Sequence, residues 1–200
     1  MSTQNSFAPL DAVILAGGAA RRMGGVDKPG LRVGGRTLLE RAADAVRAHV
    51  FDARVIVVGP ERPSPRALYT REDPPGGGPV PALRAGLRHV RAPRFALLAA
   101  DLPHLAAAHL AALDEAAHAA PGAVFVDDAG HEQWLTGLWH TETVRAALET
   151  YRRRSLYGLL GPLEPRRLRP EDEYVVFDCD TPEELARVRA ELEPRPGPDT

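Results

Sequence analysis

The chain has little of what disulfides, metal clusters and membrane spans require. Cys179 is the single cysteine among 200 residues, so an internal disulfide and a cysteine-based metal cluster are both excluded. No apolar run approaches the roughly 20 residues that cross a bilayer. Met1 to Pro9 has no basic stretch ahead of an apolar one, as a secretory signal would have. We therefore expect a soluble, cytoplasmic protein.

Charge and histidine spacing exclude further classes. The formal net charge of −2 gives no overall attraction to nucleic acid or to an anionic membrane, so positive charge that acts on anions must be local. None of the seven histidines forms an H-x-x-x-H or H-E-x-x-H pair, which argues against a zinc site. Cys179 lies between two acids that disfavour a thiolate, so a nucleophilic role is rejected. We expect neither a nucleic acid nor a membrane as partner.

Length and composition predict one folded unit. Two hundred residues with 44% hydrophobic content suffice for a substantial core. We expect a single domain over residues 1–192. Residues 193–200 contain three prolines and are predicted to form a disordered tail.

A glycine-rich loop follows the first apolar run. Ala12–Leu15 leads into Gly17-Gly18, and the next ten residues contain Arg21-Arg22 and Lys28. Glycines tolerate positive φ and let backbone amides approach a ligand, while the basic side chains supply positive charge. The pattern is neither the dinucleotide-binding motif G-x-G-x-x-G nor the P-loop motif G-x-x-x-x-G-K-[ST]. It predicts a phosphate-binding loop of another type.

Three strongly apolar runs set the fold class. Ala12–Leu15, Arg54–Gly59 and Phe95–Ala100 are continuously hydrophobic, as strands buried on both faces of a parallel sheet are. A helix is predicted from Thr37, because Thr37 and Glu40 have capping-box spacing. Strand, helix and strand at this spacing give a right-handed βαβ unit and hence an α/β fold with a mostly parallel sheet.

Periodicity and turn signals place the remaining elements. They are a strand at Ala67–Thr70, a helix over Ala82–Val90, a helix over Leu105–Ala119, strands at Ala123–Val126 and Trp134–Trp139, a helix over Thr141–Arg154 and a last strand at Tyr174–Phe177. Trp134–Trp139 alternates and is predicted to expose one face. The final helix is predicted to begin with Thr181 as N-cap, Pro182 at N1 and Glu184 at N3.

Asp101 follows the third apolar strand. An acid at the carboxyl end of a central strand lies where α/β sheets bind ligands. A hard cation that bridges phosphate oxygens needs one or two such carboxylates. The alternative is that Asp101 only caps the helix over Leu105–Ala119. His104 is interpreted as a surface residue in the first turn of that helix.

Arginines cluster near the predicted helix over Thr141–Arg154. Arg152–Arg154 close it, and such a run is typical of a solvated helix end that interacts well with the helix dipole. Together with Arg166, Arg167 and Arg169 the run could instead bind an anionic acceptor.

Four landmarks in order carry a resemblance to a known family. L-A-G-G at Leu15–Gly18 with R-M-G-G-V-D-K at Arg22–Lys28 resembles the signature loop of nucleotidyltransferases, in particular the molybdenum cofactor guanylyltransferases (MobA-type). Asp73 before Gly77-Gly78-Pro79, Asp101-Leu102-Pro103 and Asp180–Glu183 follow in the family's order. The resemblance implies a three-layer α/β/α, Rossmann-like nucleotidyltransferase fold.

The same resemblance implies a reaction and a set of roles. A phosphate of molybdopterin would attack the α-phosphorus of Mg²⁺-GTP, with release of pyrophosphate and formation of the guanine dinucleotide cofactor. The implied nucleotide-binding residues are Leu15, Ala16, Gly17, Gly18, Lys28, Asp73 and Asp101; the implied catalytic residues are Arg22, Lys28 and Asp101. Asp101 would bind Mg²⁺ and Asp73 would accept from the guanine N1–H and N2–H₂ groups. Proteins that deliver molybdopterin or receive the cofactor are implied partners.

The chain departs from the family pattern at two places. Pro81-Ala82 stands where Ala-Gly is usual. Asp178 and Asp180 replace two asparagines, and we hypothesise that one of them shares the Mg²⁺ with Asp101. Two alternatives remain: a nucleotidyltransferase for another base or acceptor, such as a molybdopterin cytidylyltransferase, and a non-catalytic nucleotide-binding protein of this fold. The L-A-G-G start, in place of L-A-A-G, favours guanine over cytosine.

Overall fold

The computed structural model describes residues 9–17, 26–176 and 181–192. Its strands are β1 (Leu10–Leu15), β2 (Arg32–Val33), β3 (Arg36–Thr37), β4 (Val55–Val58), β5 (Leu68–Thr70), β6 (Arg94–Ala99), β7 (Gly122–Val126), β8 (Glu132–His140) and β9 (Arg166–Leu168). Its α-helices are α1 (Leu38–His49), α2 (Pro79–Leu87), α3 (Ala107–Ala117), α4 (Thr141–Thr150), α5 (Leu156–Leu160) and α6 (Pro182–Leu192). Short 3-10 helices are η2 (Lys28–Gly30), η3 (Gly161–Leu163) and η4 (Glu173–Val176).

In the described part of the chain, seven strands form one sheet in the order β5-β4-β1-β6-β8-β7-β9. β1 lies between β4 and β6 and is parallel to both, and β5 extends the parallel arrangement. β8 is antiparallel to both of its neighbours, whereas β7 and β9 are parallel to each other. All six residues of β1 and of β6 are buried, which confirms the prediction from their continuous hydrophobicity.

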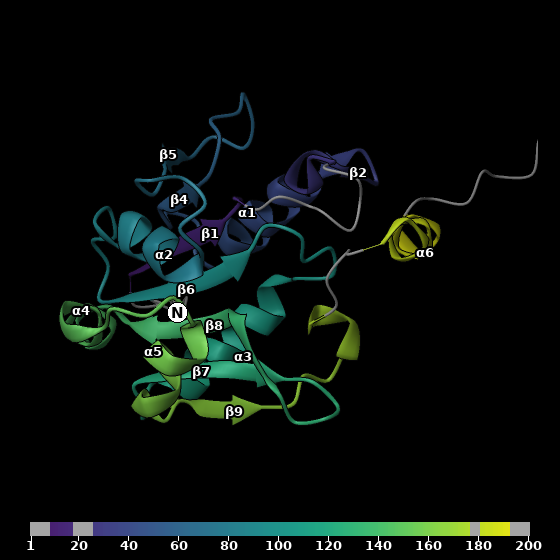
Figure 1. The fold of residues 1–200 in the computed structure, drawn as a ribbon. Helices are drawn as coiled ribbons and strands as arrows, with labels where there is room; N and C mark the ends of the chain where they lie inside the picture. Colours follow the sequence, from purple (N-terminus) through teal and green to yellow (C-terminus); the bar gives the residue numbers. More distant parts are fainter. Residues whose placement is uncertain (1–8, 18–25, 177–180, 193–200) are drawn as a thin grey trace, which may run out of the picture.

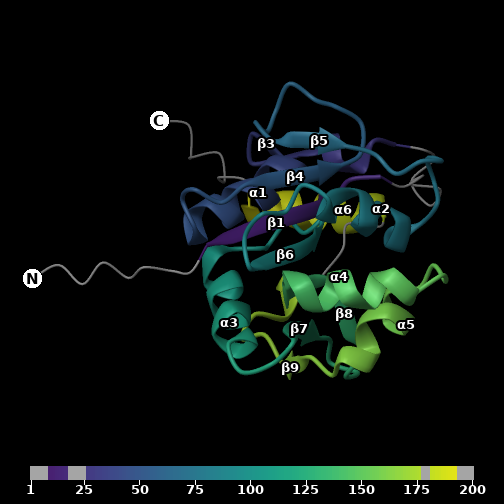
Figure 2. The same cartoon turned by 90° about the vertical axis from the view of Figure 1, so that its left-hand side faces the viewer.

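Helices cover both faces of this sheet and make three layers (Figures 1 and 2). On one face, α1 and α3 pack on a core that includes Ile14, Leu98 and Phe125. On the other face, α2, α4 and α5 pack on a core that includes Val13 and Trp139. The predicted α/β/α architecture is thereby confirmed. α6 packs separately, through Leu185 and Val188, on Val33 and Leu38.

The helix starts predicted from capping residues are found. The Thr37 hydroxyl accepts from the Glu40 amide, and Glu40 Oε2 accepts from the Thr37 amide at 2.7 Å. Thr181 and Glu184 make the same reciprocal pair before α6. In each case two amides that a helix leaves unpaired are satisfied by side chains.

Close packing positions α2 over the sheet. A Cβ on Gly86 would lie 2.6 Å from Val13 Cγ1 and 2.9 Å from Val58 Cγ2, so only glycine allows this approach. The helix begins at Pro79, three residues before the predicted start, because proline is favoured in the first turn. Its N-cap, Gly78, has a φ of +99°, which other residues rarely adopt.

One predicted element is wrong, and two others are found with a different end or a different exposure. Tyr174–Phe177 was expected to be a strand, but residues 173–176 form η4, in which the Val175 amide donates to the Asp172 carbonyl. The helix expected through Arg154 ends at Thr150, where Tyr151 takes an extended conformation. β8 is no half-exposed strand, because β6 and β7 flank it and its residues from Thr136 to Trp139 are buried.

Among the described helices, none has the length and apolar character needed to span a membrane. The prediction of a disordered tail falls on residues 193–200, outside the described part of the chain.

Candidate functional site

The carboxyl ends of the parallel strands bring the predicted site residues to one edge of the sheet. β1 leads to Ala16 and Gly17, β5 to Asp73 and β6 to Asp101. Because these strands run in the same direction, the segments that follow them share that edge. Ligands of open α/β sheets bind at such an edge.

Lys28 and Asp101 meet there. Lys28 opens η2, and its Nζ lies 3.7 Å from Asp101 Oδ2. The two side chains are 13% and 22% exposed, so the pair is partly shielded from water. Asp101 does not cap the next helix, since the N-cap of α3 is Ala106. A lysine predicted to bind the triphosphate and a carboxylate predicted to bind its Mg²⁺ are thus in contact, although 73 positions separate them.

Lys28 is anchored by its neighbour. Both Asp27 carboxylate oxygens pair with the Arg62 guanidinium, and this hydrogen bonding lowers the pKa of Asp27. A Cβ on Gly30 would lie 2.3 Å from Asp27 Oδ2, so glycine leaves room for the pair. Arg62 could not be predicted from sequence, because it lies in a proline-rich loop without a motif. Arg62 ties the segment that carries Lys28 to the loop after β4.

The described start of the glycine-rich loop lies directly on the strands. The Ala16 amide donates to the Val58 carbonyl at 2.9 Å, and Gly17 is exposed at the edge. A Cβ on Gly59 would come within 2.8 Å of the Ala16 carbonyl oxygen, so this approach requires glycine. The predictions for Gly18, Arg22, Asp178 and Asp180 lie outside the described residues.

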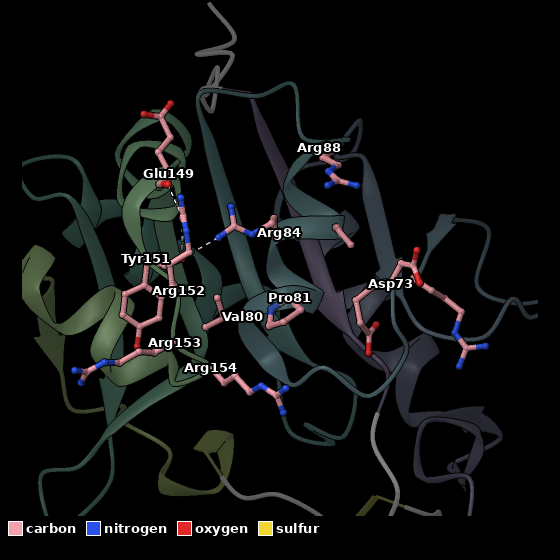
Figure 3. A pocket seen from close by; sticks show the side chains of 13 residues that line it. Asp73, Val80, Pro81, Arg84, Arg88, Glu149, Tyr151, Arg152, Arg153 and Arg154 are labelled. Carbon is pink, nitrogen blue, oxygen red and sulfur yellow. Dashed lines mark hydrogen bonds between the residues drawn. The ribbon is translucent and has the colours of Figure 1, made fainter.

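Asp73 lines a pocket beside α2 (Figure 3). The pocket has a volume of about 700 Å³ and is bounded by the segment after β5, by α2 and by the end of α4. Asp73 is exposed, while the preceding Glu72 accepts from the Gly76 amide at 2.8 Å and holds the turn before α2. Lys28 and Asp101 are not among the residues that line this pocket.

The two arginine runs lie on different elements. Arg152–Arg154 follow α4 and line the pocket beside α2, whereas Arg166, Arg167 and Arg169 do not line it. Arg167 lies on β9, the edge strand farthest from β5, and pairs with Glu132 at 2.6 Å. The two runs therefore do not line this pocket together, and a joint anion site stays a prediction.

His104 is not the surface residue of a first helical turn. It precedes α3, its side chain is 10% exposed, and its Nε2 lies 3.4 Å from Glu191 Oε2. Its ring lies 5.5 Å from that of Tyr174. Burial lowers the pKa of His104, and the nearby Glu191 opposes this effect. The contact with α6, distant in sequence, could not be predicted from local spacing.

The described residues contain no group of three or more His, Cys, Asp or Glu side chains arranged to hold a metal ion. Asp101 places a carboxylate at this edge, next to Lys28. One carboxylate suits Mg²⁺, which commonly takes one or two protein carboxylates and fills its other positions with substrate phosphates and water. The donor set at this edge therefore fits a magnesium ion that enters with a nucleotide.

Comparison with known proteins identifies a family and a named relative. Residues 12–167 match the family model described as MobA-like NTP transferase domain. A probable molybdenum cofactor guanylyltransferase from Synechococcus elongatus is 33% identical over 186 residues, covering 86% of this chain and 93% of that protein.

Solved structures share the fold. A nucleotidyl transferase from Methanothermobacter superposes with a TM-score of 0.76 at 21% identity, covering 92% of this chain and 97% of that one. The molybdopterin-guanine dinucleotide biosynthesis protein A of Archaeoglobus fulgidus gives 0.68 at 18% identity, covering 90% and 97%. The family model and the Synechococcus relative both span most of the chain. The chain belongs to the family of MobA-like NTP transferases.

Proposed function

We propose that this protein transfers GMP from GTP to the phosphate of molybdopterin, with or without bound molybdenum, in molybdenum cofactor biosynthesis. The relatives named molybdenum cofactor guanylyltransferase support the reaction. The observation that carries the proposal is the contact of Lys28 with Asp101 at the carboxyl edge of the sheet. This edge combines a cation for phosphate oxygens with a carboxylate for a divalent cation.

The reaction is a substitution at the α-phosphorus of GTP. A phosphate oxygen of the acceptor forms the new P–O bond, the bond to the bridging oxygen of the β-phosphate breaks, and pyrophosphate leaves. Such transfers depend mainly on positioning and on neutralisation of charge. Lys28, with the backbone from Leu15 to Gly18, would bind the triphosphate and stabilise the charge that develops on it. Arg22 would add a second cation.

Asp101 would hold the magnesium ion. Bound Mg²⁺ would neutralise phosphate charge and strengthen pyrophosphate as a leaving group. The Lys28 ammonium lies 3.7 Å from Asp101 and keeps that carboxylate oriented before the nucleotide arrives. Asp178 and Asp180 remain hypothetical partners of the same ion. Replacing both by asparagine tests this, and an unchanged Mg²⁺ dependence of GTP binding would reject it.

Asp73 would select the base. An ionised carboxylate only accepts hydrogen bonds, so it matches the N1–H and N2–H₂ donors of guanine. Asp73 is exposed in the pocket beside α2 and, among the described residues, makes no hydrogen bond or ion pair through its side chain. Cytosine offers no such pair of adjacent donors.

Binding calorimetry with GTP, CTP and ATP in Mg²⁺ tests the proposal. We expect selective binding of GTP, a loss of at least about tenfold for Asp101→Ala, and relaxed selectivity for Asp73→Ala. Asp52→Ala is the matched control, since Asp52 is exposed and precedes β4 at the opposite edge of the sheet. A preference for CTP would support cytidylyl transfer instead. Binding of GTP without any transfer activity would support the non-catalytic alternative, and failure to bind any nucleotide would reject the proposal.

The cellular setting is part of the proposal. We expect the protein to act in the cytoplasm, where it would receive molybdopterin from a delivering protein or pass the finished cofactor to a molybdoenzyme. Co-purification with such a protein, from cells that make the cofactor, would test this.

A further inference from the structure

The pocket beside α2 is rich in arginine. Six arginines line it, against the acids Glu72, Asp73 and Glu149. Its volume of about 700 Å³ lies within the range of small-molecule sites. The chain as a whole carries a net charge of −2, so this concentration of guanidinium groups is local. An arginine can bind a ligand only if its guanidinium is not already engaged by the protein, so the contacts of each one matter.

Two of the arginines donate hydrogen bonds to backbone carbonyls at the end of α4. Arg84 Nη2 donates to the carbonyls of Leu148 at 2.9 Å and Tyr151 at 3.2 Å. Arg152 Nη1 donates to the carbonyls of Glu149 at 2.6 Å and Tyr151 at 3.3 Å. The last carbonyls of a helix lack partners within it, and these guanidinium groups supply them. Arg84 and Arg152 are thus structural.

Arg154 is placed differently. Its Cβ lies 3.9 Å from the position that a Cβ on Gly78 would take, so the residue adjoins the N-cap of α2. Its side chain extends past Pro81, toward the side of the pocket on which Asp73 lies, while Arg153 points away from α2 (Figure 3). Within the described residues, no hydrogen bond or ion pair engages the guanidinium of Arg154 or the carboxylate of Asp73.

The start of α2 offers a ligand few backbone donors. The amides of a helix N-terminus usually bind anions and other acceptors. Here Pro79 and Pro81 carry no amide hydrogen, and the Ala82 amide donates to the Gly78 carbonyl at 3.2 Å. Among the first three residues of α2 only Val80 carries an amide hydrogen, so a side-chain donor would add to the binding of a ligand with acceptor atoms here, and Arg154 is a cation next to this place.

We infer that Arg154 binds the O6 and N7 atoms of guanine while Asp73 binds its N1–H and N2–H₂ groups. This inference rests on the proposed function. The planar guanidinium presents two parallel donors, and O6 with N7 is the acceptor pair that arginine binds most often in specific base recognition. Guanine carries donors on one edge and acceptors on the next, so it matches a carboxylate and a guanidinium that line one pocket and are unpaired within the described part of the chain.

Other bases lose part of this match. Adenine has an amino group in place of O6, and cytosine has an amino group with no N7 beside it. The analogue 7-deaza-GTP keeps the donor edge for Asp73 but lacks N7. It therefore tests Arg154 separately from Asp73.

The experiment compares the binding of GTP and 7-deaza-GTP in Mg²⁺ to wild type, Arg154→Ala, Arg154→Lys and Arg153→Ala. Wild type should bind GTP at least about tenfold more tightly than the analogue, because the analogue keeps O6 but removes one acceptor of a charged donor. Arg154→Ala should lose this preference. Arg154→Lys should keep part of the affinity but not the preference, since lysine is a point charge. Arg153→Ala should behave as wild type.

Three outcomes would overturn the inference. An unchanged preference for GTP over 7-deaza-GTP in Arg154→Ala would show that another group binds N7. A raised KM for the molybdopterin acceptor with unchanged base preference would assign Arg154 to the acceptor. A wild-type protein without preference for GTP over CTP and ATP would overturn the proposed function as well. Arg154 is exposed, so an unchanged Tm of its variants will confirm that folding is intact.

Discussion

A buried network of charged side chains lies near the amino end of β6, and mutation of it should lower the stability of the fold strongly. Asp114 of α3 lies 2.5 Å from Arg94 Nη1 of β6 and 3.4 Å from His49 Nε2 of α1. The side chains of all three are 6% exposed or less. The network therefore joins two helices to a central strand where water cannot replace a lost partner.

Asp114→Ala should lower the free energy of unfolding by about 3 to 5 kcal/mol, because it leaves the Arg94 charge buried and unpaired. This is a large part of the 5 to 15 kcal/mol that is typical of a folded domain. The corresponding fall in Tm is about 6 to 20 °C for a chain of this size. Urea unfolding at pH 7, followed by circular dichroism, measures it.

A matched control and a double variant make the test sharp. Glu115→Ala removes the next residue, whose side chain is 89% exposed, and should change stability by less than about 0.5 kcal/mol. Arg94→Met combined with Asp114→Leu should recover most of the loss, since apolar groups can replace a buried ion pair. A cost below about 1 kcal/mol for Asp114→Ala, or a double variant as unstable as the single one, would refute this reasoning.

Two further predictions concern the site and its surroundings. Burial lowers the pKa of His104 below its ordinary value of 6.5, so the unfolded chain binds the proton more readily. The free energy of unfolding should therefore fall as the pH drops below about 6.5, and His104→Asn should flatten this slope in urea titrations; an unchanged slope would count against it. Asp27→Asn should cost at most about 1 kcal/mol of stability, because the pair with Arg62 is partly exposed, yet weaken GTP binding about tenfold by releasing the segment of Lys28. Loss of stability without loss of binding would contradict that role.

The central fold followed from the sequence because its signals are local. β1, β4 and β6 are uninterrupted apolar runs, which only a doubly covered sheet can bury. The starts of α1 and α6 were predicted because a capping box needs only two residues three positions apart. Asp101 was predicted to act at the edge because its strand was identified.

The missed elements depend on distant partners. β9 contains Arg166 and Arg167, and it was overlooked because an edge strand that pairs only with β7 needs no apolar alternation. Tyr174, Val175 and Val176 are residue types that favour strands. In the structure, however, the Val175 side chain is buried and the Tyr174 side chain is 47% exposed. Asp172 instead accepts from the Tyr174 amide and starts a helical turn.

The site was predicted only in part, because some of its contacts join residues that are distant in sequence. Lys28 and Asp101 were each predicted to act near the end of an apolar strand of a mostly parallel sheet, but their direct contact was not predicted. The roles of Arg62 and Arg154 did not follow, because each depends on how a loop without a motif packs on a distant element. The position of Arg154 beside α2 required the fold.

The most direct measurement is the transfer reaction itself. Purified protein, GTP, Mg²⁺ and molybdopterin are combined, and pyrophosphate release is measured together with formation of the guanine dinucleotide. We predict one pyrophosphate for each dinucleotide formed, with activity reduced at least about a hundredfold in Asp101→Ala and retained in Asp52→Ala. Equal activity of wild type and Asp101→Ala, or transfer from CTP in preference to GTP, would contradict the account.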